Sequence, residues 1–517
     1  MIERKIKPCL NKNSQNINTM KIISVVGARP NFMKIAPFIR AIKEYNSYNI
    51  NSVVSSEANI AKPEGDNSPI QSLKEEPFGQ NNKGLPANSS DMSGSAEGNI
   101  NISARKKENT SFKIQNQQQI THLLVHTGQH YDDRMSRAFF QSLGIPEADI
   151  NLGIGSGSHA EQVGKTMIEF EKVIIEEKPD WIVVVGDVNA TLACSVTAKK
   201  LHVKVCHIEA GLRSRDESMP EEINRMVTDR LSDLLLTPDK LSIDNLKAEG
   251  VPDSRINFVG NIMIDTLEAN RKKASGLQIT DIIKSNILDG QKLPDSVLLN
   301  FSQNFQNNAH SGVDNIIPVA KEKMNRDIRE SFRKTENTKN STKDYAVITL
   351  HRPSNVDEKN TLSPIINFLI TVVADDMPVI WPIHPRTQKM LQKFGLWKRA
   401  VNSKNLLLLH PIGYHEMLRL NMNARIMLTD SGGLQEECCV LGTPCLTLRW
   451  NTERPVTLRE HGGASVLVGN NVERIKKEYR ETLQLKRKPQ RPELWDGNTA
   501  IRCVQSILNH SQFIPQY

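Results

Sequence analysis

Short runs of apolar residues, each followed at once by polar residues or glycine, recur along this chain at residues 21–26, 123–125, 181–185, 203–208, 345–350, 379–383 and 426–428. Runs this short, bounded by polar residues, are typical of strands buried in a parallel sheet. Helical patterns follow several of the runs, so strands and helices alternate. This alternation predicts an α/β fold, with open and mostly parallel sheets covered by helices on both faces.

The length of the chain, 517 residues, predicts more than one domain, because a single hydrophobic core seldom organises so many residues. We expect two Rossmann-like doubly wound domains, at residues 20–266 and 344–483, that face each other across a cleft. Such sheets bind ligands beyond the carboxyl ends of their strands, so the polar residues that follow the apolar runs should line this cleft. Residues 484–517 form a C-terminal segment whose helix, at 494–508, is expected to pack back on the N-terminal domain.

Three segments lack this pattern and are expected to carry no chemistry. Residues 1–19 form a polar, basic N-terminal tail that resembles neither a secretory signal nor a membrane anchor. Residues 57–119 are rich in Asn, Ser, Gly, Glu and Lys, and bury too little apolar surface to offset the entropy of ordering. We therefore predict a low-complexity, disordered insertion there. Residues 267–343 are assigned to a linker or insertion, with helices at 279–287 and 316–332, and a partner-binding role for the insertions stays open.

The overall composition argues against several classes of partner. The formal charge is +8, from 66 basic and 58 acidic residues, and no dense basic tract or interleaved aromatic residues indicate a nucleic-acid surface. No apolar run approaches the roughly 20 residues that a membrane-spanning helix needs. The seven cysteines are odd in number and lack CxxC spacing, which favours a reduced, cytoplasmic protein without a zinc site.

Carboxylates follow two of the apolar runs. Glu209 comes directly after the run 203–208, and Glu221 stands in what reads as the acidic first turn of the next helix. Asp187 follows another such run in the same way. Any one of these side chains taken alone fits solvated loop charge equally well. Their repetition at strand ends instead favours an active site.

The sequence Asp430-Ser431-Gly432-Gly433 predicts a seat for a diphosphate. It joins an apolar run to a helical pattern, where free backbone N–H groups and glycines let an anion approach a helix N-terminus. The alternative is an ordinary helix N-cap. Arg29 follows the first apolar run, from where its guanidinium would reach a phosphate held by the other domain. No Gly-x-Gly-x-x-Gly follows that run, so a tightly bound dinucleotide cofactor is not supported.

A set of motifs at the ends of these runs is specific as a group: Gly27-Ala-Arg-Pro30, Thr127-Gly-Gln-His130, Gly186-Asp187, His207-Ile-Glu-Ala-Gly-Leu-Arg213, Met219-Pro-Glu-Glu-Ile-Asn-Arg225, Thr349-Leu-His-Arg-Pro353, Asp430-Ser-Gly-Gly-Leu-Gln-Glu-Glu437 and Asn451-Thr-Glu-Arg-Pro455. In this order the motifs resemble those of the UDP-N-acetylglucosamine 2-epimerase family. The resemblance implies a fold like that of B-type glycosyltransferases and a cytoplasmic homodimer, without metal or cofactor, that serves polysaccharide biosynthesis. The implied reaction interconverts UDP-N-acetylglucosamine and UDP-N-acetylmannosamine.

The resemblance also implies roles for residues of this chain. The implied catalytic residues are Asp187, Glu209, Glu221 and His351. The implied UDP-sugar-binding residues are Arg29, Arg213, His384, Ser431, Gly432, Gly433, Glu437 and Arg454. Which carboxylate acts as acid and which as base stays open. Asn224 and Arg225, in the same motif as Glu221, fit the surface of a helix equally well.

The implied chemistry is elimination followed by re-addition. The C2 proton of the sugar is not adjacent to a carbonyl group, so we expect UDP to leave first, the C2 proton to be lost to give a glycal, and UDP to add back after protonation on the opposite face. Carboxylates suit the proton transfers, and basic groups with helix N-termini suit the departing UDP. The loop at 351–355 departs from the commoner family pattern, which leaves the substituents of the sugar open. A hydrolysing relative, a B-type glycosyltransferase and a non-catalytic sugar-nucleotide sensor stay as alternatives.

Overall fold

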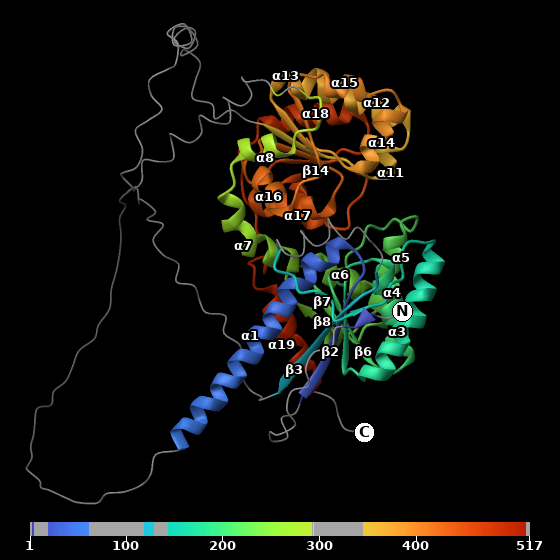
Figure 1. Ribbon diagram of the computed structural model, residues 1–517, viewed down its shortest axis with the longest axis vertical. Helices are drawn as coiled ribbons and strands as arrows, with labels where there is room; N and C mark the ends of the chain where they lie inside the picture. The colour runs from blue at the N-terminus through green and yellow to red at the C-terminus, as the bar shows by residue number, and fades with distance from the viewer. Residues whose placement is uncertain are drawn as a thin grey trace, which may run out of the picture.

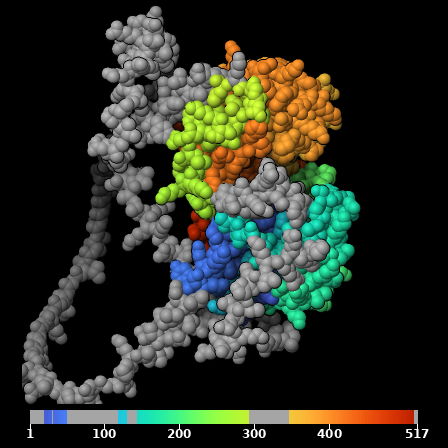
Figure 2. Space-filling model, viewed as in Figure 1, coloured from blue at the N-terminus to red at the C-terminus, as the bar shows by residue number. Residues whose placement is uncertain are grey.

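Two β-sheets, each covered by helices, organise the chain (Figure 1). The computed structural model describes residues 3–4, 19–60, 118–128, 143–291, 293 and 345–512. One sheet belongs to an N-terminal domain and the other to a C-terminal domain, drawn blue to green and orange in the space-filling view (Figure 2). This arrangement confirms the predicted α/β fold with two Rossmann-like domains.

The sheet of the N-terminal domain has eight strands, in the order β1-β4-β3-β2-β5-β6-β7-β8, and only β1 is antiparallel to its neighbour. The strands are β1 (Glu3–Arg4), β2 (Thr19–Val26), β3 (Gln119–His126), β4 (Ile150–Asn151), β5 (Trp181–Val185), β6 (Lys204–Ile208), β7 (Leu234–Thr237) and β8 (Ile256–Phe258). All five residues of β5 are buried, as expected for a parallel strand that is covered on both faces.

The sheet of the C-terminal domain has six parallel strands in the order β11-β10-β9-β12-β13-β14. The strands are β9 (Ala346–Thr349), β10 (Val379–Pro382), β11 (Leu406–Leu409), β12 (Ile426–Thr429), β13 (Cys445–Thr447) and β14 (Ser465–Leu467). This order is the doubly wound one, in which the chain builds half of the sheet in one direction from its first strand and the other half in the opposite direction.

The helices connect successive strands. Those of the N-terminal domain are α1 (Arg29–Ile60), α3 (His159–Glu177), α4 (Asn189–Lys200), α5 (Pro220–Leu231), α6 (Lys240–Ala248) and the 3₁₀ turn η1 (Asp253–Arg255). Those of the C-terminal domain are α11 (Pro353–Val356), α12 (Lys359–Phe368), the π-helical turn η3 (Leu369–Val373), α13 (Ala374–Asp376), α14 (Pro385–Lys393), α15 (Trp397–Val401), α16 (Tyr414–Asn423), α17 (Gly432–Leu441), the 3₁₀ turns η4 (Pro455–Thr457) and η5 (Arg459–His461), and α18 (Val472–Leu483).

Each sheet has one point at which its winding direction reverses. In the N-terminal sheet the reversal lies between the neighbours β2 and β5, and in the C-terminal sheet between β9 and β12. Loops that leave two such strands diverge, which opens a crevice at the carboxyl ends of the strands. The loops after β5 and β12 begin with the predicted motifs Gly186-Asp187 and Asp430-Ser431. The topology therefore places both motifs where a doubly wound sheet binds ligands.

Helices α7 (Ile262–Ser275) and α8 (Ile279–Asn286) run from the N-terminal to the C-terminal domain along one side of the molecule (Figure 1). Helix α7 contacts α1 in the N-terminal domain and also α16 and α17 in the C-terminal domain. The predicted domain boundary at residue 266 is therefore wrong, because it divides a continuous helix that buries Ile264, Leu267 and Ala274. The helix predicted at 279–287 corresponds to α8.

The C-terminal helix α19 (Thr499–Gln512) lies against the N-terminal domain, beside α1 (Figure 1). Trp181 Nε1 of β5 donates a hydrogen bond to Ser511 Oγ at 3.0 Å, and Trp495 Nε1 donates to the Pro238 carbonyl at 2.9 Å. The helix starts later than the predicted 494–508, because Leu494 has a φ of +62°, outside the helical region. Helix α19 thus completes the core of the N-terminal domain.

Much of the predicted insertions lies outside the described residues. The edges predicted for the first insertion, 57–119, are wrong, because α1 continues to Ile60 and β3 begins at Gln119. The predicted disorder of residues 61–117 and the helix predicted at 316–332 fall outside the described part of the chain. Within the described part, every helix is too short or too polar to cross a membrane.

Candidate functional site

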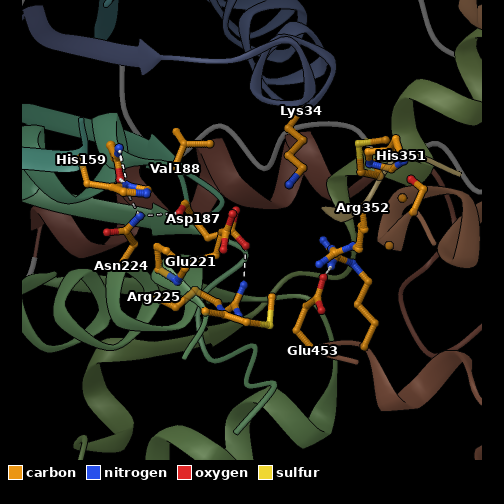
Figure 3. Close-up of a pocket in the computed structure, with 18 of the residues that line it drawn as sticks. Lys34, His159, Asp187, Val188, Glu221, Asn224, Arg225, His351, Arg352 and Glu453 are labelled. Atoms are coloured by element: carbon orange, nitrogen blue, oxygen red, sulfur yellow. Dashed lines mark hydrogen bonds and ion pairs between the residues drawn. The ribbon is translucent and has the colours of Figure 1, made fainter. Parts of the chain in front are cut away.

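A cavity of about 530 Å³ lies at the carboxyl ends of both sheets and is lined by side chains from both domains (Figure 3). The predicted site residues that line it are Asp187, Glu221, His351, Ser431, Gly432, Gly433 and Arg454. These residues come from separate strand ends and helix starts. They meet at the crevices that open where the winding direction of each sheet reverses. The structure therefore gathers more than half of the predicted site around one cavity.

Asp187 follows β5 and faces the first turns of α5 (Figure 3). Arg225 Nη1 donates to Asp187 Oδ2, and Nη2 of the same guanidinium donates to Glu222 Oε2 at 2.5 Å. Arg225 is only 2% exposed, so its alternative assignment to a helix surface is wrong. Because one buried cation is shared by two carboxylates, Arg225 holds Asp187 in a defined orientation at the cavity wall.

Glu209 follows β6 and, although it is not among the residues that line the cavity, it contacts a lysine that lines it. Its Oε2 accepts a hydrogen bond from Lys34 Nζ at 2.5 Å, and Arg454 Nη2 of the other domain is 3.9 Å away. Among the described residues, none donates a hydrogen bond to Glu209 Oε1. The φ of Glu209 is +71°, a conformation that costs a residue with a side chain on the order of 1–3 kcal/mol. Backbone strain that the surroundings maintain is typical of functional positions.

Glu221 stands in the first turn of α5, next to Pro220, which begins the helix. Its carboxylate is exposed and lines the cavity close to Asp187 (Figure 3). The positive end of the helix dipole favours the ionised form of a carboxylate at this place. Two successive strand-to-helix segments, β5 to α4 and β6 to α5, thus supply the three carboxylates of Asp187, Glu209 and Glu221.

Asp430, after β12, organises the loop that follows β9. Its Oδ2 accepts hydrogen bonds from the backbone N–H groups of His351 and Arg352, each at 2.9 Å, and its Oδ1 lies 2.7 Å from His351 Nδ1. Burial alone would raise the pKa of Asp430, but the hydrogen bond and charge of His351, together with the two amides, hold this pKa below its usual value. An ionised Asp430 therefore orients the His351 ring at the cavity.

Helix α17 begins at Gly432, and its N-terminus meets the cavity. A Cβ atom on Gly432 would lie 2.9 Å from Arg454 Nη1 and equally close to Glu453 Oε1, so only glycine leaves room for these side chains. Arg454 Nε also donates to Glu436 Oε1 at 2.5 Å. A helix N-terminus and a guanidinium side by side place positive charge at this end of the cavity, which suits a diphosphate.

Two predicted ligand-binding residues lie away from the cavity wall. Arg213 is buried and forms ion pairs of 2.7 Å with Asp229 and with Glu249. Glu437 is buried on α17 beside Tyr414, and burial raises the pKa of its carboxyl to about 7, partly offset by hydrogen bonds. The structure thus assigns Arg213 to an internal ion-pair network and Glu437 to the packing of α17, because both side chains point into the domains.

Two further predicted residues have different positions. His384 caps α14, where its Nδ1 accepts a hydrogen bond from the Arg386 backbone N–H, and its ring centroid is 5.6 Å from that of His351. Burial and the nearby His351 lower the pKa of His384. Arg29 is the first residue of α1, and its side chain lies outside the described part of the structure.

Comparison with known proteins agrees with this architecture. The family model described as UDP-N-acetylglucosamine 2-epimerase matches residues 112–299 and 309–508. This chain belongs to the UDP-N-acetylglucosamine 2-epimerase family. The resemblance inferred from the motifs is thereby confirmed, and membership of this family makes the protein an isomerase.

Individual members of the epimerase family support the same assignment. The UDP-N-acetylglucosamine 2-epimerase of Methanocaldococcus jannaschii is 38% identical over 391 residues, which cover 75% of this chain and 92% of that protein. The crystal structure of this relative in complex with UDP-GlcNAc and UDP matches with a TM-score of 0.64 and 32% identity, over 95% of this chain and all of that one. The UDP-2,3-diacetamido-2,3-dideoxy-D-glucuronate 2-epimerase of Pseudomonas aeruginosa is 36% identical over 361 residues, 69% of this chain and 83% of that protein.

Reasoning from the sequence missed several side chains that line the cavity of this epimerase-family protein. Lys34 is the clearest example, because it is a lysine inside the apolar stretch from Phe32 to Phe38. A charge in such a stretch indicates a buried ion pair, which the contact with Glu209 provides. Of the adjacent carboxylates Glu436 and Glu437, the prediction selected Glu437, whereas Glu436 lines the cavity. Helix periodicity alone does not reveal which of two adjacent residues faces a ligand.

Side chains with amide and imidazole groups, among them Asn224 and His159, line the cavity beside Asp187 (Figure 3). Asn189 Nδ2 donates to Gln162 Oε1 at 2.8 Å, and His159 Nδ1 lies 3.3 Å from Asn189 Oδ1. Asn224 Nδ2 donates to the Asp187 carbonyl at 2.9 Å, which joins this group to the carboxylates. Amide and imidazole groups both donate and accept hydrogen bonds, so this wall suits hydroxyl or acetamido groups of a sugar.

Proposed function

We propose that this protein interconverts UDP-N-acetylglucosamine and UDP-N-acetylmannosamine by eliminating and re-adding UDP, without net hydrolysis. The observation that carries the proposal is the cavity, which is lined by the N-terminus of α17 with Arg454 and by the carboxylates of Asp187 and Glu221. His351 and Arg352 of the C-terminal domain lie across it from these carboxylates (Figure 3). A nucleotide sugar that lies along the cavity would meet cationic groups with its diphosphate and carboxylates with its reacting carbons. The names of the M. jannaschii and other relatives support the same reaction.

The proposed reaction balances without water. The C1–O bond breaks, its electron pair passes to the UDP oxygen, and the C2 proton passes to a carboxylate, which leaves a glycal with a C1=C2 double bond. A proton then adds to C2 on the opposite face, and the same diphosphate oxygen forms a new bond to C1. Both intermediates must stay bound for this sequence, and a cavity enclosed by two domains favours their retention.

The positions of the side chains suggest a division of roles. Asp187 and Glu221 are proposed to exchange the C2 proton, because both reach the cavity from the N-terminal domain. Glu209 is proposed to stabilise the positive charge that develops at C1 and to hold Lys34 in place. His351 lies beside the start of α17 and is proposed to donate a hydrogen bond to the departing diphosphate.

A second candidate is the epimerisation of a modified UDP-N-acetylglucosamine. The observation that favours it is the P. aeruginosa relative, which is named for a diacetamido glucuronate and whose identity of 36% is close to the 38% of the M. jannaschii enzyme. The hydrogen-bonding side chains of His159 and Asn189 would accept an additional acetamido group as readily as a hydroxyl. Both nucleotide sugars therefore belong in the same assay.

The test is proton NMR of each nucleotide sugar with the purified protein in D₂O. Appearance of the C2 epimer with deuterium at C2, and without accumulation of free UDP, is the expected result. Stoichiometric UDP with free N-acetylmannosamine would instead assign the hydrolysing reaction, and no change in either sugar would favour a glycosyltransferase or a sensor. Glu221→Gln and Asp187→Asn should lower turnover by roughly 10²–10⁴-fold while UDP still binds. Glu217→Gln, an exposed carboxylate of the same loop, is the matched control.

We also propose that the protein is a homodimer that pairs through the helical layer of the N-terminal domain. Ile168 and Ile175 of α3 are 58% and 60% exposed, and Ile223 of α5 is 42% exposed. Helices α3 and α5 both pack against α4, so these apolar side chains belong to one layer. Exposed apolar clusters of this kind mark protein contacts. Light scattering should give twice the chain mass, and Ile168→Asp with Ile223→Asp should give the monomer mass; a monomeric wild type would contradict the proposal.

A further inference from the structure

His207 is a buried, ionisable residue that has no part in the chemistry proposed above. It lies on β6, two residues before Glu209, and its side chain is completely buried. Its Nδ1 is 2.6 Å from Asp229 Oδ1, and its Nε2 is 2.9 Å from the carbonyl oxygen of Gly186. Both ring nitrogens therefore have a partner within hydrogen-bonding distance, on opposite sides of the ring.

Both partners of the His207 ring are acceptors. The Gly186 carbonyl can only accept, and Asp229 accepts from the Gly211 backbone N–H at 3.0 Å and from Arg213 Nη1 at 2.7 Å through its other oxygen. Burial alone would raise the pKa of Asp229, but His207 and Arg213 outweigh burial and hold this pKa below its usual value. With a carboxylate on one side and a carbonyl on the other, each ring nitrogen faces an acceptor, and an imidazolium ring satisfies both acceptors with its two N–H groups.

The imidazolium joins the three elements that carry the carboxylates of the site. His207 is part of β6, which ends at Glu209; Gly186 precedes Asp187 after β5; and Asp229 belongs to α5, whose first turn carries Glu221. Gly186 has a φ of +70° and so forms the turn that directs Asp187 into the cavity. A movement of the His207 ring would therefore shift all three carboxylates relative to each other.

Side chains hold every carbonyl group at the end of β5. Asn31 Nδ2 donates to the Val185 carbonyl at 2.6 Å, His207 donates to the Gly186 carbonyl, and Asn224 Nδ2 donates to the Asp187 carbonyl at 2.9 Å. The bond from His207 is the charged one of the three, and charge-assisted hydrogen bonds are about twice as strong as neutral ones. The position of Asp187 is thus fixed through its backbone as well as through its carboxylate.

We infer that His207, held between Asp229 and the Gly186 carbonyl with a nitrogen-bound proton toward each, is a positioning residue that sets the spacing of Asp187, Glu209 and Glu221. It does not touch the cavity, so it acts through these residues. The kinetic consequence rests on the proposed epimerase activity, whereas the protonation state of the ring does not. A displacement of catalytic groups by about 1 Å can cost roughly 100-fold in rate, so loss of the ring should lower kcat by about that factor.

The first experiment is ¹H–¹⁵N NMR of the wild-type protein with labelled histidine at neutral pH. We expect the His207 ring to show two nitrogen-bound protons, assigned by their contacts to neighbouring amides and by their loss in His207→Gln. A ring with a single nitrogen-bound proton would overturn the proposal, whatever the enzyme turns over. This measurement needs no substrate, and the assignment through neighbouring amides needs no variant.

The second experiment is the kinetics of His207→Gln, which retains one donor but no charge. The expected result is a kcat about 100-fold lower, with the KM and the dissociation constant for UDP changed less than threefold. His415→Gln is the matched control, because His415 is also buried, donates or accepts a single 2.8 Å hydrogen bond with Asn270, and lies outside the cavity wall. A loss of kcat no larger than that of the control would overturn the proposal. A wild-type protein without turnover would refute the proposed function instead, and the NMR result would still decide the state of His207.

Discussion

The ion pair between Lys34 and Glu209 allows a quantitative test of the site. Lys34 Nζ and Glu209 Oε2 are 2.5 Å apart, and the two side chains are only 9% and 3% exposed. Replacing Lys34 by Met leaves a buried carboxylate whose next cation, Arg454 Nη2, is 3.9 Å away and too distant for a hydrogen bond. Breaking a buried pair in this way costs about 3–5 kcal/mol. The free energy of unfolding of the N-terminal domain should fall by that amount.

The double variant Lys34→Met with Glu209→Gln separates the interaction energy between the two side chains from the effect of each substitution alone. The neutral Gln does not need a cation, so the double variant should regain most of the stability, with an interaction energy of about 2–3 kcal/mol between the two positions. Urea denaturation followed by tryptophan fluorescence reports on both domains through the buried Trp181 and Trp381, and the variants should shift the transition of the N-terminal domain. Lys172→Met is the control, because Lys172 pairs with Glu169 at 2.8 Å but is 57% exposed and should change stability by less than about 1 kcal/mol.

The stabilities of these single and double variants test whether Glu209 is a buried anion. Two results would show that the Glu209 carboxylate is solvated or neutral in the folded protein. One is a loss in the free energy of unfolding below about 1 kcal/mol for Lys34→Met, and the other is a loss in the double variant equal to the sum of the two single losses. The view of Glu209 as a buried anion, available to stabilise positive charge on the sugar, would then be refuted.

Three further predictions concern the C-terminal domain. The pKa of Asp430 is lowered in the folded state, so its ionised carboxylate stabilises the protein above the usual pKa of about 3.9. This stabilisation is lost as the pH falls through the lowered pKa. The variant Asp430→Asn should therefore show a smaller fall in melting temperature between about pH 4 and 2. Burial raises the pKa of Glu437 to about 7, so the wild type should lose stability as pH rises from about 4.3 towards 7, and Glu437→Gln should abolish that loss in melting curves at pH 5 and 8. Gly432→Ala places a Cβ atom 2.9 Å from Arg454 Nη1 and should weaken UDP binding about tenfold by calorimetry, whereas unchanged affinity would mean that the diphosphate binds elsewhere.

The strands could be predicted where the apolar runs were long or ended in a motif. The run 181–185 coincides with β5, and the runs before Glu209 and Asp430 correspond to β6 and β12. The strands β4 and β8 were missed because they contain two and three residues, too few to show a periodicity. The boundary at residue 266 failed for another reason: α7 packs on both domains, and packing partners are not visible in a local pattern.

The predicted site residues likewise fall into those that a local pattern places correctly and those that it does not. Asp187, Glu221 and the glycines before α17 line the cavity, and each stands at the end of a strand or the start of a helix. Arg213 shares a motif with Glu209 but forms a buried ion pair with Asp229 instead of facing the cavity. Both residues are polar and both follow β6, so residue type and spacing do not distinguish a ligand contact from an internal one.

The fold class and the family could be predicted from the chain alone, because alternating strands and helices need only local periodicity and the motifs lie in their characteristic order. The same patterns place carboxylates and glycines at the ends of strands. Which of these groups meet could not be predicted in this way: Lys34 pairs with Glu209, Arg225 with Asp187, and His207 with Asp229. The partners of a buried charge come from distant parts of the chain, and only the folded sheet brings them within hydrogen-bonding distance.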